Sequence, residues 1–184
     1  MAFLFLKVPH ETARLLHDVE VPGEKSHIEE MHITLLYLGK GIPFINIAKA
    51  MMVCHEVLEH QQPFLMRISK ISTFPENPDD GVPIICPVES PELMIFQKTL
   101  ANEFNKFGLE YDKKFPDFKP HVTLAYDKNS DFKESPLPMP MIWAAQSMSI
   151  WGGDRGDGPA EINMPFTLTK PSKMSAKLSG INWI

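Results

Sequence analysis

Residues 31–38 read MHITLLYL and residues 120–126 read PHVTLAY, so the pattern His-x-Thr-Leu occurs twice in this chain of 184 residues. Both segments alternate in the way that β-strands do, with successive side chains on opposite faces. This period places His32 and Thr34 on one face and the intervening apolar residues on the other. The pattern therefore predicts two strands that each present an imidazole and a hydroxyl on the same face.

The repetition decides how these histidines are interpreted. A single histidine in an apolar strand is most often a structural residue, and threonine favours strands for steric reasons alone. The chain has seven histidines, however, and two of them stand in nearly identical four-residue motifs that lie about half the chain length apart. Duplication of a strand under functional constraint explains this better, so we interpret His32, Thr34, His121 and Thr123 as the two halves of one catalytic site.

These residue types suit the cleavage of a phosphodiester. One neutral imidazole can take a proton from the attacking water, while a second, protonated imidazole gives a proton to the leaving ribose oxygen. The threonine hydroxyls can donate hydrogen bonds to the non-bridging oxygens, where negative charge grows in the transition state. The scheme needs neither a metal nor a cofactor, and the sequence does not decide which histidine is the acid.

The composition limits the classes of protein and of partner. Hydrophobic residues make up 43% of the chain and charged residues 22%, which is typical of a soluble globular domain. A net charge of −5 argues against a protein that coats duplex nucleic acid, because such binding relies on many basic contacts. A small nucleotide or an RNA end remains compatible as a partner, and we expect a monomer.

Two further features bear on the compartment. No apolar stretch has the length of a membrane span, and the N-terminal segment lacks a basic leader, so we expect no membrane association. Cys54 and Cys86 have neither the spacing of metal ligands nor the density of a disulfide scaffold. We therefore expect a cytoplasmic protein.

The hydrophobic periodicity predicts a mixed α+β arrangement with two related halves, not a regular β-α-β array. Apolar residues at helical spacing predict helices at residues 10–18, 43–60 and 91–107. Apolar runs predict strands at residues 1–9, 64–71 and 82–88, in addition to the two motif strands, and a closing strand pair at residues 141–151 and 162–169. Prolines predict loops at residues 74–80 and 135–140.

Residues 31–39 and 118–125 resemble the paired H-x-T-x signatures of the two-histidine (2H) phosphoesterase superfamily. That superfamily includes the 2'-5' RNA ligase and 2',3'-cyclic phosphodiesterase proteins of bacteria, archaea and phages. The resemblance implies a bilobal fold of two antiparallel sheets related by pseudo-twofold symmetry, with helices outside and a central cleft. A single domain would cover residues 1–169, and residues 170–184 would form a C-terminal tail.

The motifs and the resemblance together predict a metal-independent hydrolase. Its substrate would be a ribonucleotide phosphodiester, namely a 2',3'-cyclic phosphate, or a cyclic or 2'-5' linked oligonucleotide. Two other functions stay open. A binding module on the same fold could sense a nucleotide or an RNA end, although a pure binder has little need of two proton carriers. RNA ligation, suggested by the relatives' names, is less simple than hydrolysis with the same two groups.

Other residues are candidates on weaker grounds. Lys7 could attract phosphate and Phe5 could stack on a base if that face of the first strand looks into the cleft; a surface lysine and a core phenylalanine are the alternative. Trp151 could offer a stacking surface at the cleft mouth, although packing is the simpler interpretation. A regular alternation puts Tyr37 and Tyr126 opposite the histidines, so we predict that both are core residues.

A metal centre is the one rival site. Residues 55–60 read HEVLEH. This segment resembles the zinc-binding motif H-E-x-x-H but has one additional residue before the second histidine. On a helix, histidines five residues apart diverge by roughly 140° around the axis. We therefore predict no metal site and interpret this segment as a solvated helix face.

Overall fold

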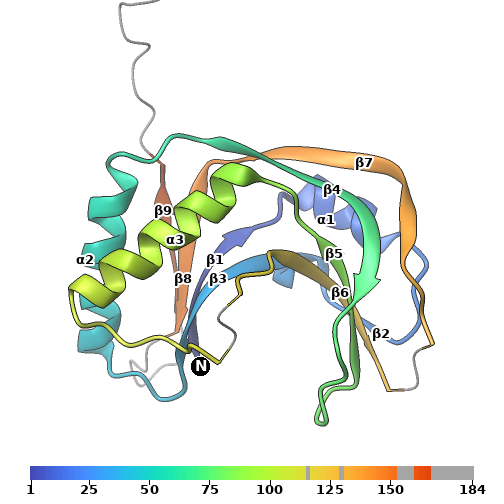
Figure 1. The fold of residues 1–184 in the computed structure, drawn as a ribbon, viewed down its shortest axis with the longest axis horizontal. Coiled ribbons are helices and arrows are strands. Elements are labelled where there is room, and N and C mark those ends of the chain that lie inside the picture. The colour runs from blue at the N-terminus through green and yellow to red at the C-terminus, as the bar shows by residue number, and fades with distance from the viewer. Residues whose placement is uncertain (115–116, 129–130, 153–159, 167–184) are drawn as a thin grey trace, which may run out of the picture.

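Two antiparallel sheets form the framework of the protein (Figure 1). The structure is a computed structural model that describes residues 1–114, 117–128, 131–152 and 160–166. Its elements are β1 (Ala2–Lys7), α1 (His10–His17), β2 (Glu24–Lys25), the 3-10 helix η1 (Ile28–Glu30), β3 (His32–Gly39), α2 (Phe44–Leu58), β4 (Phe64–Thr73), β5 (Val82–Pro87), α3 (Pro91–Lys106), β6 (His121–Asp127), β7 (Ser135–Ala145), β8 (Ser147–Gly152) and β9 (Ala160–Pro165).

The strand order places the two motif strands in different sheets. One sheet has the order β3-β1-β8-β9 and contains the first motif, whereas the other has the order β2-β6-β5-β4-β7 and contains the second. In both sheets the motif strand pairs with a short apolar strand, which is β1 in the first sheet and β5 in the second. The predicted α+β fold with two antiparallel sheets is confirmed.

Helix α3 packs against both sheets and so joins them. It begins at Ser90, whose hydroxyl accepts a hydrogen bond from the Leu93 amide at 3.2 Å, with proline at the first helical position. Its predicted apolar stripe is buried, and the Phe96 ring lies 5.8 Å from the Phe64 ring of β4. The same helix also contacts β3. The hydrophobic core that the two sheets share therefore forms around one face of α3.

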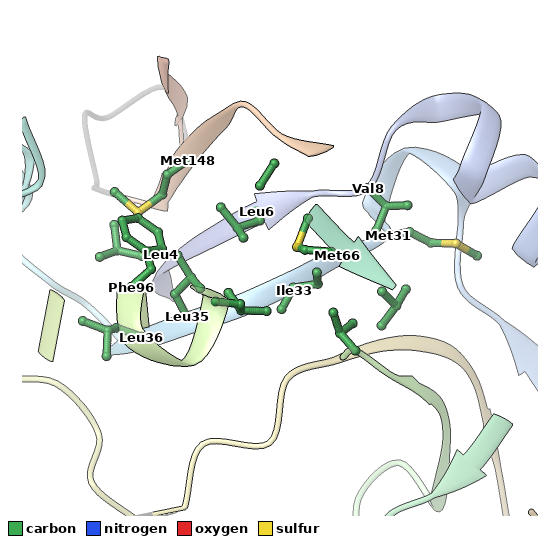
Figure 2. Close-up of a cluster of buried hydrophobic side chains, with 14 of the residues drawn as sticks. Leu4, Leu6, Val8, Met31, Ile33, Leu35, Leu36, Met66, Phe96 and Met148 are labelled. Atoms are coloured by element: carbon green, nitrogen blue, oxygen red, sulfur yellow. The ribbon is translucent and has the colours of Figure 1, made fainter. Parts of the chain in front are cut away.

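Alternation along β1 separates the core from the face that carries the candidate site. Leu4 and Leu6 point into a buried cluster with Leu35 and Phe96 (Figure 2). Because successive side chains of a strand alternate, Phe3, Phe5 and Lys7 point to the other face. Packing of the leucines thus fixes which residues of β1 lie beside the first motif.

Residues 135–145 differ from the prediction. The Pro-rich residues 135–140, predicted as a loop, form the first half of β7, which pairs with β4 at the edge of its sheet. Proline is tolerated at an edge because no outer strand needs its missing amide hydrogen. The predicted pairing of residues 141–151 with 162–169 is correct only for β8, since residues 141–145 belong to the other sheet.

Two smaller points complete the fold. The three predicted helices are present as α1, α2 and α3, with ends within two residues of those predicted. No helix among the described residues combines the length and the hydropathy needed to cross a membrane. The predicted tail, residues 170–184, lies outside the described residues.

Candidate active site

Each motif opens its strand at an equivalent position. His32 is the first residue of β3 and His121 is the first residue of β6, and all four motif histidines and threonines are partly buried. Strands β3 and β6 approach within 8 Å between Cα atoms, although they belong to different sheets. The two halves of the predicted site therefore meet where the sheets adjoin.

Both histidine rings are held by the same hydrogen bond. His32 Nδ1 lies 2.6 Å from the carbonyl oxygen of Glu30, and His121 Nδ1 lies 2.7 Å from that of Lys119. A carbonyl oxygen only accepts, so Nδ1 must carry the hydrogen and donate it. In the neutral rings Nε2 is then unprotonated, which makes it the nitrogen that exchanges a proton with a substrate.

The electrostatic environment lowers the pKa of both histidines. For His32, burial is the largest cause, and it is opposed by the Glu30 carbonyl and by the carboxylates of Glu30 and Glu161. For His121, burial again comes first, opposed by the Lys119 carbonyl, while a charge on His32 lowers the pKa further. A positive charge on His32 therefore disfavours the protonation of His121.

Aromatic rings flank each imidazole. The rings of Phe3 and Phe5 lie 5.1 and 5.3 Å from the His32 ring, the first stacked and the second edge-on. On the other side, the Phe74 ring meets the His121 ring edge-on at 4.6 Å. The sequence did not single out Phe74, which was predicted to begin a loop and directly follows β4. These rings limit the rotation of both histidines.

A bulge in each motif strand corrects the prediction for the tyrosines. Register shifts between β1 and β3 and between β5 and β6 leave one extra residue directly after each motif threonine, Leu35 in β3 and Leu124 in β6. The following residue is buried as well in both strands, so the alternation is reset. Tyr37 pairs with Phe3 on the histidine face and Tyr126 is 38% exposed, so neither is the core residue that regular alternation predicts.

The three weaker candidates share the face of the first motif. Lys7 pairs with His32 across the β1–β3 ladder, Phe5 pairs with Thr34, and Trp151 of β8 pairs with Phe3. Phe5 is only 5% exposed, so little of its surface remains for stacking on a base. The partly buried Trp151 retains more accessible surface. The glycine-rich residues 153–159 that follow it lie outside the described residues.

A polar cluster that the sequence did not reveal lies beside these residues. Ser149 of β8 is 2% exposed, and its hydroxyl lies 3.3 Å from a Glu161 carboxylate oxygen and 3.2 Å from the Asn163 side-chain oxygen. The other carboxylate oxygen of Glu161 lies 3.7 Å from Lys7 Nζ. This carboxylate therefore ties β9 to the strand that pairs with His32.

A cavity of about 340 Å³ adjoins the second motif. Its lining includes the rings of Phe74 and Phe118, with Met94 of α3 and Lys119 beside them. A pocket of this size and apolar character can accept a planar ring, and Phe74 connects it directly to His121.

The two histidines of the segment HEVLEH do not lie on one helix. Helix α2 ends at Leu58, so His60 lies beyond the helix, and His55 Nε2 is 3.8 Å from a Glu59 carboxylate oxygen. Within the described parts of the chain, no three histidine, cysteine or acidic side chains converge as metal ligands would.

Comparisons with known proteins bear on the family and on the fold. Residues 8–138 match the family model of the 2'-5' RNA ligase superfamily. The fold resembles TT0787 of Thermus thermophilus, with a TM-score of 0.72 and 18% identity over 90% of this chain and 97% of that one. It also resembles Escherichia coli LigT complexed with 3'-AMP, with a TM-score of 0.64 and 15% identity over 90% and 94% of the two chains. No curated protein sequence matches the chain significantly.

The structural likenesses concern the fold, since their sequence identities are low. The family match covers well over half of the chain and includes both repeated motifs. The two-histidine resemblance that the motifs suggested is thereby confirmed, and the chain belongs to the 2'-5' RNA ligase superfamily.

Proposed function

We propose that the protein is a metal-independent phosphodiesterase that hydrolyses a ribonucleotide phosphodiester, with His32, Thr34, His121 and Thr123 as its catalytic residues. The observation that carries this proposal is the matched hydrogen bonding of the two histidines. Each ring donates from Nδ1 to a carbonyl oxygen two residues earlier, so each can use Nε2 for proton transfer. A binding module would not need two imidazoles prepared in the same way.

The reaction follows from these groups. One Nε2 takes a proton from water, whose oxygen attacks phosphorus, while the protonated Nε2 of the other histidine transfers its proton to the departing ribose oxygen as the P–O bond breaks. The hydroxyls of Thr34 and Thr123 stabilise the charge that grows on the non-bridging oxygens. Proton exchange with solvent then restores the starting protonation of both rings. Lys7 supplies a cation near the phosphate, and Trp151 supplies a stacking surface.

The substrate class has two supports. LigT, which shares the fold, has been crystallised with 3'-AMP and with ATP, so proteins of this shape accept nucleotides. In addition, the apolar cavity beside His121 has room for a nucleobase. A 2',3'-cyclic phosphate, or a cyclic or 2'-5' linked oligonucleotide, combines a base with a strained or accessible diester.

The direct test is turnover of a substrate panel by the full chain. The panel contains the four 2',3'-cyclic mononucleotides and matched 2'-5' and 3'-5' linked dinucleotides, each with and without EDTA. We expect a phosphomonoester product from at least one member and equal rates in EDTA, because imidazoles carry the protons. Loss of activity in EDTA would refute metal independence. Binding to the panel without any product would instead support the nucleotide-binding module.

The pH dependence offers a second prediction. Activity requires one protonated and one neutral histidine, so kcat/KM should be bell-shaped with its maximum between the two pKa values. Burial lowers both pKa values below the usual 6.5, so we expect the maximum on the acidic side of about pH 6.5. Rates fall at lower pH as the base is protonated and at higher pH as the acid loses its proton. A rate that keeps rising above neutral pH would contradict the scheme.

A further inference from the structure

The two halves of the site are alike in hydrogen bonding but differ in charge. The residue whose carbonyl holds the imidazole is Glu30 in the first motif and Lys119 in the second. The residue that pairs with the histidine on the neighbouring strand is Lys7 for His32 and Pro87 for His121. The pseudo-symmetric site is therefore electrostatically asymmetric, and its two histidines need not play equal parts.

Carboxylates gather on the side of His32. Glu30 lies two residues before it, and Glu161 of β9 lies 3.7 Å from Lys7, the residue that pairs with His32 across the β1–β3 ladder. Both carboxylates raise the pKa of His32 against the larger, opposite effect of its burial. The positive charge on this side, Lys7, is engaged with Glu161 at 3.7 Å and is thereby partly neutralised. The buried hydroxyl of Ser149 contacts the same carboxylate and helps to fix its position.

Within the described part of the chain, no carboxylate shifts the pKa of His121 in this way. Among the described residues, the charged group that affects its protonation is His32, which disfavours a second positive charge. The second sheet does contain a comparable trio, in which the Glu134 carboxylate lies 2.9 Å from Lys70 Nζ and also binds the Ser72 side chain. Glu134 is not among the groups that shift the pKa of His121, so it serves as a control for a glutamate that a lysine and a serine bind.

We propose that Glu30 and Glu161 are positioning residues that keep the proton on His32, which makes His32 the general acid and His121 the general base. As applied to catalysis, this assignment rests on the proposed function. His121 Nε2 accepts a proton from water as the water oxygen bonds to phosphorus. The P–O bond to ribose breaks with its electron pair on oxygen, and His32 Nε2 delivers its proton there.

The placement of the proton can be measured without any substrate. NMR titration of the imidazole Cε1–H signals in the full-length protein gives both histidine pKa values directly. We expect a higher pKa for His32 than for His121 in the wild type. Glu30→Gln and Glu161→Gln should each lower the pKa of His32, and the double variant should lower it further. Glu30→Gln leaves the backbone carbonyl in place, so it isolates the effect of the charge.

Glu134→Gln is the matched control, and Glu161→Asp tests whether charge alone is enough. Glu134→Gln should leave both histidine titrations unchanged, whereas Glu161→Asp should retain most of the wild-type value for His32. Glu161 and Lys7 are partly exposed, so the individual effects are expected to be moderate. Unchanged titration of His32 in the double variant, or an equal change in Glu134→Gln, would overturn the proposal.

Kinetics then test the assignment of roles. In the double variant the basic limb of the kcat/KM profile should move to lower pH, and the rate at pH 8 should fall by about threefold to tenfold. On a nucleoside diester with 4-nitrophenolate as leaving group, which needs no proton, His32→Ala should lose about 100-fold less activity than on a cyclic phosphate. The opposite pattern, with His121→Ala spared, would reverse the assignment.

The two proposals fail in distinguishable ways. If His32 holds the proton as expected but no panel member is turned over, the proposed hydrolysis fails while the proton placement stands. If turnover occurs but the titrations show His121 as the more basic residue, the hydrolysis stands and the role of the two carboxylates is refuted.

Discussion

Replacing either His32 or His121 by alanine is expected to lower kcat on a cyclic nucleotide by about 10²–10⁴-fold, because each removal takes away one of two coupled proton transfers. Both imidazoles are partly buried and bound through Nδ1, so no water or neighbouring side chain can easily replace their Nε2. Steady-state kinetics of the purified variants provide the measurement, and thermal melts establish that the variants remain folded.

A variant that lacks both histidines provides a stricter test of the mechanism. Groups that act as one unit give strongly non-additive losses, so His32→Ala/His121→Ala should be little worse than the more damaging single change. His55→Ala is the matched control, since His55 is an exposed histidine of α2 away from the site. It should retain wild-type activity. A single-site variant at His32 or His121 with nearly wild-type kcat would exclude the paired-histidine mechanism.

Removal of the threonine hydroxyls should produce the second largest effect. Thr34→Val and Thr123→Val are each expected to lower kcat by about 10–10³-fold, in the range found when a donor to a developing negative charge is lost. Valine keeps the branched shape of threonine and its preference for strands, so β3 and β6 should persist. Thr34→Ser and Thr123→Ser retain the hydroxyl and should recover much of the loss.

The way in which the kinetic constants change will show when the hydroxyls act. If the hydroxyls donate mainly in the transition state, the valine variants should have a lower kcat and a nearly unchanged KM. An unchanged kcat with a raised KM would indicate that the hydroxyls bind the ground state and the transition state equally well. Thr99→Val on α3 is the control, because the Thr99 hydroxyl donates to the Ile95 carbonyl within its own helix. Its kinetic constants should equal those of the wild type.

Local patterns predicted most of the secondary structure because they are enforced by local physics. Helix α3, for example, carries an apolar stripe, a serine cap with a following proline, and Gly108 with positive φ just beyond its end. Each of these signals acts within a few residues of the chain. The first half of β7, residues 135–140, was missed because its prolines argue for a loop, and only its place at a sheet edge makes them acceptable.

The tyrosines show the limit of strict alternation. A period of two describes a regular strand, and it fails after one extra residue. The bulges at Leu35 and Leu124 arise from the pairing of β3 with β1 and of β6 with β5, which involves partners far apart in the sequence. Tyr37 therefore joins the histidine face although the sequence alone assigns it to the core.

The repeated motif and its strand period were enough to predict the two motif strands and the superfamily, and they predict the four residues of the proposed site, because these signals lie within a few neighbouring residues. Folding adds a difference between the two halves that the local pattern does not contain. Glu161 lies more than one hundred residues from His32 along the chain, and the pairing of β1 with β3 and β8, and of β8 with β9, brings its carboxylate to Lys7, which pairs with His32. Electrostatic effects depend on distance in space, so the sequence shows the local difference between Glu30 and Lys119 but cannot show that Glu161 lies on the side of His32.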